Sequence, residues 1–579
     1  MNSLLLALLA FAGYILAYGT YGRFLGRRLF KLDDQASMPA HQYYDGVDYV
    51  PSKKHIIFGH HFTTIAGLGP IVGPAIGIIW GWLPAFIWVF LGSIFMGAVH
   101  DFSTLVVSAR NQGKSIGDLT GDLISPGTRY VFQFIMQLLL FIVLSVFAMI
   151  VGVLFEMYPE AVVPVWMQIP IAVWLGWQIR NGKNDLVYSI IAVLFMYASI
   201  IAGVYLPVRV PPVFGSSVIT WCILLFIYVF FASTIPVQKL LQPRDYINSH
   251  QLLVAMVLLM AGLIVAHPVI TAPAVNSNAF AGDSDIPGLM PILFITIACG
   301  AVSGFHSLAS SGTTVKQVDK ENDTLFIGYG GMIWESFLAV LVLMAVAAGL
   351  GMGFEDNGKS YSGLEAFRHH YSSWAAFAGI DAKLEAFVVG ASNLFNRLGL
   401  PTLFGKSLIA VFIVSFANTT IDSATRIQRL SLQEIFKDKT GRIRKPVHNR
   451  YAATFLVVLA ATIMTFIKPG ATGALILWPL FGSLNQLLAA LALGVVSLYL
   501  YYKGKNILFT LIPMIFVLFV TIWAMLDNLL DFFYKDEYLL MGLSAVIIFL
   551  TAWLLVSGIT ALIKYRRNRI TGINVSSTV

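Results

Sequence analysis

Long apolar runs follow one another along almost the whole chain, and they constrain the fold more than any other feature. Each run is close to the roughly 20 apolar residues that a helix needs to cross a bilayer. Only 11% of the 579 residues are charged, whereas a soluble domain carries about a quarter. In lipid, a spanning segment must satisfy its own backbone hydrogen bonds. The sequence therefore predicts one all-α integral membrane protein.

About fifteen of these runs qualify as transmembrane helices. They lie near residues 2–21, 56–81, 83–109, 129–157, 160–179, 185–206, 216–238, 251–267, 289–314, 324–351, 405–425, 451–467, 472–502, 507–526 and 538–563. The first run has neither a basic leader nor a small-residue cleavage site. We therefore expect a retained helix there and not a removed signal peptide.

Lysine and arginine are concentrated in every second connection between the predicted helices. If the N-terminus is outside, most of the 37 basic residues, Lys239 and Arg244 among them, face the cytoplasm. The positive-inside rule thus predicts an outer N-terminus and a cytoplasmic C-terminus. This placement explains the net charge of +8 without a nucleic-acid partner, and the expected surroundings are membrane lipid.

The helices after the first form two sets of five with opposite polarity. Residues 55–206 would start in the cytoplasm and residues 214–427 outside, as in a transporter with a five-plus-five inverted repeat. The other parts are an extra helix at 1–21, a cytoplasmic segment at 22–54, an external segment at 352–404, a basic cytoplasmic loop at 428–450, and about four helices with a basic tail at 451–579. The segment 352–404 is either a set of interfacial or lid helices or a plain loop with short helices.

Glycine and proline interrupt the first helix of each predicted half. Gly67, Gly69 and Pro70 stand in the first, and Pro236 stands in the second. Proline removes a hydrogen-bond donor and glycine weakens a helix, so both helices should unwind and free backbone groups for a ligand. The candidate substrate-binding residues beside these breaks are His60, His61, Thr63, Thr64, Gly67, Gly69, Ser233, Thr234 and Gln238.

Ionisable and hydroxyl side chains inside the apolar runs are the candidates for ion coupling. Polar groups at bilayer depth are costly and mark functional sites by default. The candidates are His100, Asp101, His306, Ser307, Ser310, Ser311 and Asp422, and Glu335 is a further ionisable residue in such a run. Histidine beside a carboxylate can carry a proton, whereas dense hydroxyls either bind a cation such as Na⁺ or bond to helix carbonyls. The coupling ion, H⁺ or Na⁺, stays open, and a structural hydrogen bond is the alternative for each residue.

Other classes of protein find little support. His60 and His61 are adjacent, so on a helix they point about 100° apart and cannot chelate one ion. Cys222 and Cys299 both lie in apolar runs, which predicts neither a disulfide nor a transition-metal site. The sequence has no Walker A motif and no nucleophile–base spacing that indicates an enzyme. We expect no cofactor besides the coupling ion, and the alternative is a channel or a membrane-embedded sensor or enzyme.

Several long motifs resemble those of the carbon starvation protein A (CstA) family. They lie at residues 45–51, 58–62, 65–74, 97–102, 239–246 and 478–489. The resemblance implies a multi-pass carrier in the bacterial inner membrane that takes up peptides, or pyruvate in some members, when carbon is scarce. It also implies the core of the amino acid–polyamine–organocation superfamily, which is leucine-transporter-like and agrees with two sets of five helices. A homo-oligomer stays open.

Overall fold

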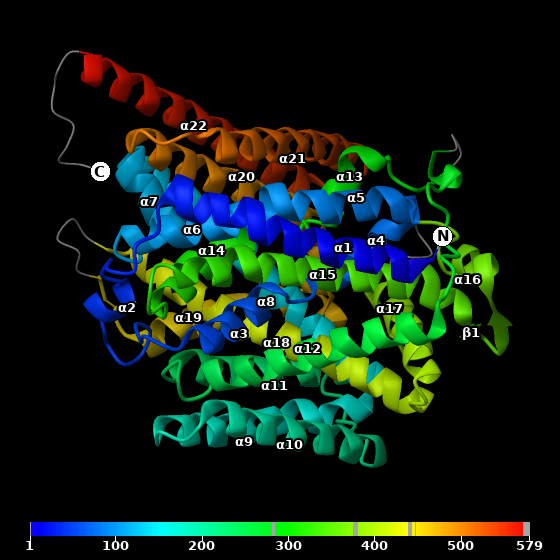
Figure 1. Cartoon of the computed structure of the whole chain (residues 1–579). Coiled ribbons are helices and arrows are strands. Elements are labelled where there is room, and N and C mark those ends of the chain that lie inside the picture. The colour runs from blue at the N-terminus through cyan, green and yellow to red at the C-terminus, as the bar shows by residue number, and fades with distance from the viewer. Residues whose placement is uncertain (1, 281–283, 375–379, 438–442, 446, 571–579) are drawn as a thin grey trace.

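The computed structural model describes residues 2–280, 284–374, 380–437, 443–445 and 447–570, and these are helical almost throughout (Figure 1). The α-helices are α1 (Ser3–Ala17), α2 (Pro39–Gln42), α3 (Lys54–Ile65), α4 (Gly69–Gly77), α5 (Trp82–Gly92), α6 (Ala98–Arg110), α7 (Ile116–Leu123), α8 (Pro126–Met157), α9 (Val162–Arg180), α10 (Asp185–Tyr205), α11 (Ser217–Thr234), α12 (Leu241–Ala266), α13 (Leu289–Thr296), α14 (Gly304–Gly312), α15 (Gly331–Met344), α16 (Gly363–His370), α17 (Ile380–Arg397), α18 (Thr402–Ile435), α19 (Arg450–Phe466), α20 (Trp478–Tyr502), α21 (Leu508–Tyr534) and α22 (Tyr538–Ile570). The strands are β1 (Phe354–Asp356) and β2 (Lys359–Tyr361), which pair antiparallel. The fold is thus helical as predicted, apart from this small hairpin.

The number of membrane-spanning helices is lower than the sequence predicted. Among the described residues, 12 helices are long and apolar enough to cross a membrane, or 13 if the bent pair α3–α4 is one span. The predicted run 289–314 is divided into α13 and α14, and the run 451–467 forms the 17-residue helix α19. The expected count of about fifteen is therefore not confirmed. Apolar composition alone does not reveal where a helix is interrupted.

Two helix boundaries differ from the sequence prediction in ways that affect the site. α11 ends at Thr234, so Pro236 follows this helix and does not interrupt it. The second interrupted segment lies instead at 297–303, between α13 and α14. α12 begins at Leu241, ten residues before the predicted start of its apolar run, and so includes Arg244. The prediction that Arg244 lies in a connection was wrong. Its charge lowers the local hydropathy, so the sequence prediction started the apolar run later. In the structure, buried partners compensate this charge within the helix.

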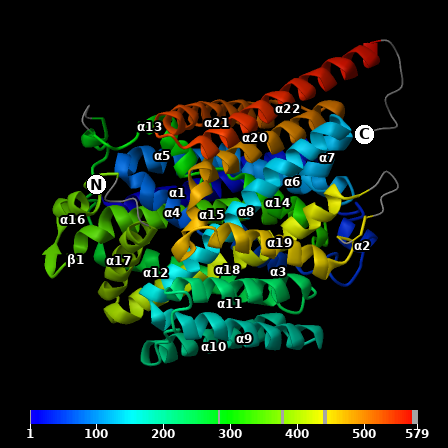
Figure 2. The ribbon, with the colours of Figure 1, turned by 180° about the vertical axis from the view of Figure 1, so that it is seen from behind.

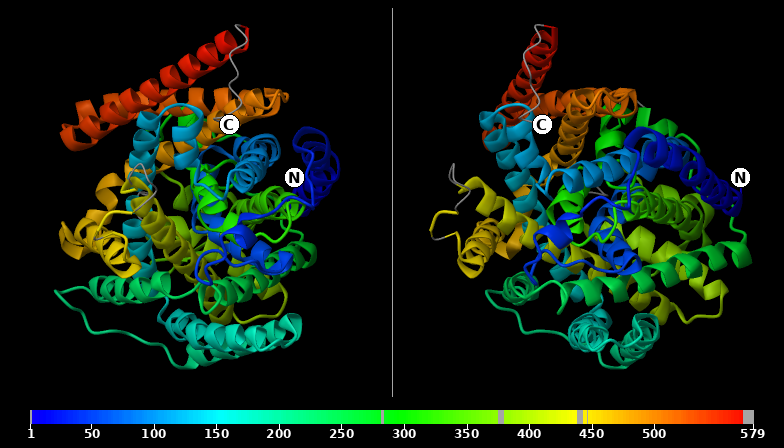
Figure 3. Two further views of the ribbon diagram at one scale, coloured as in Figure 1. Left: turned by 90° about the vertical axis from the view of Figure 1, so that its left-hand side faces the viewer. Right: turned by 60° about the vertical axis from the view of Figure 1, so that its left-hand side comes forward.

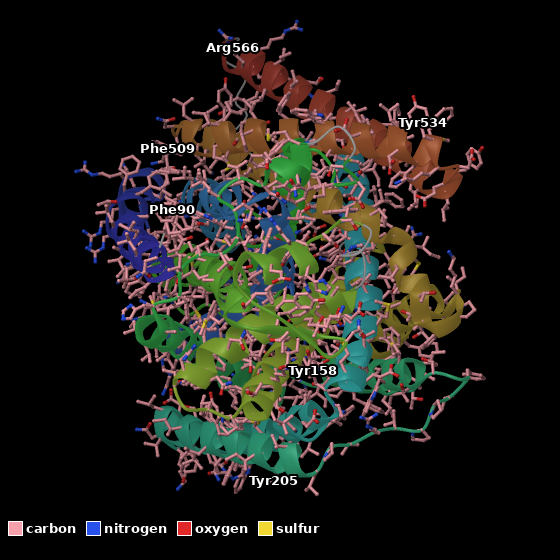
Figure 4. All side chains as sticks on the ribbon, turned by 90° about the vertical axis from the view of Figure 1, so that its right-hand side faces the viewer. Phe90, Tyr158, Tyr205, Phe509, Tyr534 and Arg566 are labelled. Carbon is pink, nitrogen blue, oxygen red and sulfur yellow. The ribbon has the colours of Figure 1, made fainter. Side chains whose placement is uncertain are left out.

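The helices run side by side in layers. Figure 1 shows α9 and α10 at one edge and α21 and α22 at the opposite edge, and Figure 2 shows the same order from behind. α22 lies along the outer edge in both views of Figure 3, and Figure 4 places its Arg566 opposite Tyr205 of α10. The most buried spans are those that contain α8, α15, α18 and α20. These spans therefore form the best-shielded part of the bundle.

Segment 352–404 holds more than a loop. It contains β1, β2, α16 and α17, and the register pairs Phe354 with Tyr361. α17 packs along α18 and also contacts α4 and α12. Its inward residues Leu384, Phe387 and Leu394 are buried. Part of the segment thus belongs to the helical core.

Candidate functional site

The break between α3 and α4 is the first component of the site. α3 ends at Ile65, α4 begins at Gly69, and the two helices are bent by 43°. A Cβ atom at Gly67 would overlap Oγ1 of Thr420 in α18, and one at Gly69 would overlap the side chain of Cys299. Both positions therefore require glycine for close approach. Because Cys299 lies between α13 and α14, the two interrupted segments meet here.

The second break is held by a side chain of α20. The amide Oδ1 of Asn485 accepts hydrogen bonds from the backbone N–H of Phe305 (2.9 Å) and from Ser303 Oγ (3.2 Å). Asn485 is fully buried, and its Nδ2 lies 3.5 Å from Sγ of Cys299. Asn485 stands in the motif 478–489, yet its role was not predicted. The sequence signal was an amide inside an apolar run, which usually needs a partner.

A histidine–carboxylate cluster lies beside the second break. We give this name to His100, Asp101, His306 and Glu335, which come from α6, α14 and α15 and are all fully buried. Asp101 lies 2.7 Å from Nδ1 of His100 and 2.8 Å from Nδ1 of His306. Oε2 of Glu335 lies 3.3 Å from Nε2 of His306, and neither Glu335 oxygen has a hydrogen-bond partner among the described residues. The structure thus brings three predicted residues together and adds Glu335.

An arginine–carboxylate cluster lies on the other side of α3. We give this name to His60, Tyr228, Arg244, Asp245 and Asp422, which come from α3, α11, α12 and α18. Arg244 forms an ion pair with Asp422 and donates to the hydroxyl of Tyr228. Tyr228 donates to Oδ2 of Asp422 (2.9 Å), and Nδ1 of His60 lies 2.5 Å from Asp245. Asp422, predicted with His100 and Asp101, therefore belongs to a different cluster.

Neighbouring histidines on α3 serve the two sides separately. His60 contacts Asp245, whereas Nδ1 of His61 lies 3.0 Å from the hydroxyl of Thr314. Their divergence agrees with the helical geometry expected for adjacent residues. In the part of the chain that the structure describes, no group of three or more His, Cys, Asp or Glu residues is arranged to hold a metal ion.

Most predicted hydroxyl residues bond to backbone carbonyls. Thr63 donates to Gly59, Thr234 to Phe231, Ser307 to Gly304 and Ser311 to Ser307, at 2.7 to 2.9 Å. Thr64 Oγ1 lies 3.1 Å from Ser423 Oγ, and Ser233 donates to the carbonyl of Asp422 (3.4 Å). Ser310 Oγ is buried with no hydrogen-bond partner among the described residues. Gln238 lies half-buried in the turn between α11 and α12.

A short segment before α3, residues 45–52, closes one end of this region, and we call it the strap. Its Asp48 accepts from Arg426 (2.7 Å) and from Arg429 (3.0 Å), both of which are buried in α18. Burial alone would raise the pKa of Asp48, but Arg429 and Arg426 hold this pKa well below its usual range. The strap backbone also bonds to Val237, Lys316 and Gln317. The strap therefore joins the ends of α11, α14 and α18.

The family model and the similar proteins point to one family. Residues 2–524 match the model of the family described as carbon starvation protein CstA. The chain is 32% identical to the peptide transporter CstA of Campylobacter jejuni, with 92% of this chain and 81% of that protein covered. It is 33% identical to the pyruvate/proton symporter BtsT of Escherichia coli, with 88% and 80% covered.

Solved structures with a similar course of the chain are transporters. One is a mutant of the manganese transporter of Eremococcus coleocola, with a TM-score of 0.47, 11% identity, and 90% of this chain and 99% of that chain covered. Another is MhsT in complex with L-phenylalanine, with a TM-score of 0.46, 13% identity, and 82% and 98% covered.

Proposed function

Because the chain belongs to the carbon starvation protein CstA family, we propose that it takes up peptides or pyruvate across the bacterial inner membrane by ion-coupled secondary active transport during carbon starvation. One observation carries this proposal: two buried ionisable clusters flank two helix interruptions that meet in the centre of the bundle. Intramembrane charges of this kind are costly and typically serve ion or substrate pathways. Relatives named as transporters also favour transport over catalysis.

We infer that the core consists of two inverted halves. The first comprises α3–α4, α5–α6, α8, α11 and α12, and the second comprises α13–α14, α15, α18, α19 and α20. Equivalent helices make equivalent contacts: α3 packs on α12 as α14 packs on α20, and α7 packs on α8 as α17 packs on α18. The halves then span 54–266 and 289–502, with α9 and α10 as an inserted hairpin. These bounds replace 55–206 and 214–427, because the second interruption lies at 297–303.

The substrate site in this proposal lies where the two interruptions meet. Gly67 and Gly69 allow the close approach there, and the unwound residues 66–68 and 297–303 offer backbone groups that are not used in helices. Transporters with inverted repeats bind substrates at such broken helices near the midplane. Thr64 and Cys299 would border the substrate.

The coupling ion in this proposal is the proton, carried by the histidine–carboxylate cluster. An imidazole and a carboxylate in contact can pass a proton between them, because both groups can change their protonation. Asp101 contacts two histidines in this way. Na⁺ is the second candidate, favoured by the unpartnered hydroxyl of Ser310. The hydrogen bonds of Ser307 and Ser311 to carbonyls within α14 support the proton.

An outer N-terminus would place the strap on the cytoplasmic side. α1 begins at the end of the bundle opposite to that at which α22 ends, in agreement with termini on different sides (Figure 1). With the basic residues in the cytoplasm, the strap would close the inner end of the substrate path. Alternating access then requires Asp48 to part from Arg426 and Arg429.

Uptake into proteoliposomes tests the proposal. Labelled pyruvate and a labelled dipeptide are offered under an imposed pH gradient or Na⁺ gradient, with wild type, Glu335→Gln and the exposed control Glu365→Gln. We expect accumulation of one solute under the pH gradient, its loss in Glu335→Gln, and normal uptake in Glu365→Gln. Failure of both solutes under both gradients would reject the substrate assignment.

A further inference from the structure

We propose that Arg244 receives a free carboxylate of the transported solute and that Asp422 is its exchangeable counter-ion. The inference rests on the proposed transport function and names the chemical class of solute: one with a free carboxylate, as in a 2-oxo acid or at the C-terminus of a peptide. It starts from a guanidinium group that is 2% exposed inside a predicted membrane span.

Arg244 has donors to spare. A guanidinium carries five N–H donors in a planar fork that fits a carboxylate with two parallel hydrogen bonds. Here one Nη bonds to Tyr228 and pairs with Asp422, and the other donates to Thr419 (3.1 Å) and lies 3.7 Å from Oδ1 of Asp245. Nε has no hydrogen-bond partner among the described residues. The fork is therefore only partly used.

Asp422 is an incomplete partner for this arginine. Its Oδ2 takes both the ion pair with Arg244 and the hydrogen bond from Tyr228. Its Oδ1 is buried and has no hydrogen-bond partner in the described chain. A solute carboxylate that engages two donors of Arg244 would make more hydrogen bonds than Asp422 does. Such a solute can compete for the arginine.

α18 connects this pair to the proposed substrate site. Thr420 donates to the carbonyl of Thr64 at the end of α3 (3.2 Å), and Ser423 contacts the hydroxyl of Thr64 (3.1 Å). Asp422 lies between these two residues, and Thr420 also fills the space beside Gly67. Asp422, the ion-pair partner of Arg244, thus lies within one helical turn along α18 of the residues that contact the interruption.

Charge balance couples the exchange to one proton. The ionisable groups that face Asp422 are Arg244 and Asp245 of α12, Tyr228 of α11, His60 of α3 through Asp245, and Arg426 one turn along α18. A second anion on Arg244 would leave an uncompensated buried charge, which is strongly unfavourable. When the hydrogen bonds of Arg244 pass from Asp422 to the solute, Asp422 therefore takes up one proton from water. The charge of the cluster then stays the same.

The test compares carboxylates with their amides in purified, full-length protein. Pyruvate, pyruvamide, a dipeptide and its C-terminal amide are measured by direct binding and by counterflow in proteoliposomes. The variants are Arg244→Gln, Asp422→Asn and the double variant, with Lys239→Gln as an exposed basic control. The double variant removes both charges together, so it leaves no unpaired charge if Arg244→Gln fails to fold.

We expect Arg244→Gln and the double variant to lose at least about tenfold in affinity for the carboxylate and to bind the amide as wild type does. Asp422→Asn should retain carboxylate binding and counterflow but lose the pH dependence of binding and the accumulation driven by a pH gradient. Preference for pyruvate or for the dipeptide identifies the source of the carboxylate.

Two results would overturn the inference: a double variant that still prefers the carboxylate, or an Asp422→Asn variant with unchanged pH dependence. If wild type moves neither solute, the proposed function itself fails, and the inference falls with it. Unchanged variants in an active wild-type background would refute the inference alone.

Discussion

The two buried clusters differ in one chemical respect. The arginine–carboxylate cluster contains a permanent cation, Arg244, whereas the histidine–carboxylate cluster contains none. A guanidinium group stays charged at any physiological pH and suits the binding of an anion, while imidazole and carboxylate groups can change their protonation. The difference indicates that the arginine–carboxylate cluster binds the solute, with Asp422 protonated on exchange, and that the histidine–carboxylate cluster transfers protons without a permanent cation. His60 of α3 belongs to the arginine–carboxylate cluster, and its neighbour His61 contacts Thr314 just after α14, the helix that carries His306.

The largest effect is expected at Asp101, which joins two histidines of the proton-carrying cluster. Asp101→Asn should reduce uptake driven by a pH gradient by about 100-fold, because a positioned proton carrier is lost. Counterflow of unlabelled against labelled solute should persist. Arg244→Gln should instead weaken binding. The exposed Asp122→Asn is the matched control, and equal losses of counterflow in Asp101→Asn and Arg244→Gln would break the comparison.

Asp48 tests whether the stability of the strap also depends on a permanent charge, here the ion pairs of Asp48 with Arg426 and Arg429. Asp48→Asn leaves Arg426 and Arg429 buried without their carboxylate, so the free energy of unfolding should fall by about 3 kcal/mol. The pKa of Asp48 is lower in the folded protein than in the unfolded chain, where it is about 3.9. The ionised carboxylate therefore stabilises the folded protein fully at pH values above that unfolded pKa. This stabilisation is lost as the pH falls from the unfolded pKa through the lower, folded pKa.

Thermal unfolding in detergent between pH 5 and 8 measures this effect. The difference between wild type and Asp48→Asn should stay constant over that range, with the exposed Asp34→Asn unchanged. A difference that shrinks toward pH 5 would contradict a permanently ionised Asp48.

Gly67 lies in the break between α3 and α4 and tests whether the interruption must stay tightly packed. Gly67→Ala should destabilise the protein by about 1–3 kcal/mol and lower uptake, because the added Cβ overlaps Oγ1 of Thr420. The double variant Gly67→Ala/Thr420→Ala removes the overlapping hydroxyl and should recover much of the loss. If the double variant is no better than Gly67→Ala, the close contact is not the cause.

The sequence predicted the membrane class and the first interruption and named His100, Asp101 and His306 as ion-coupling candidates, because each leaves a local signal. Arg244 was assigned to a connection, since hydropathy averages over a window and cannot detect partners such as Asp422, which lies far away in the sequence. The interruption at 297–303 was missed for a related reason. It depends on Asn485 of α20, which supplies the hydrogen bonds that an unwound backbone needs.

The smallest effect is expected for the hydroxyls of α14, which lie on the same helix as His306 and decide between proton and sodium. Ser307 donates to the carbonyl of Gly304, so Ser307→Ala should cost about 1 kcal/mol of stability and leave uptake within about twofold. Ser310 has no such bond among the described residues, so Ser310→Ala should not lower stability. Uptake under a pH gradient and under a Na⁺ gradient measures both variants. A loss of Na⁺-driven uptake in Ser310→Ala would assign a Na⁺ site to this helix, and a wild type that accumulates solute only under the Na⁺ gradient would remove the proton-carrying role from the histidine–carboxylate cluster.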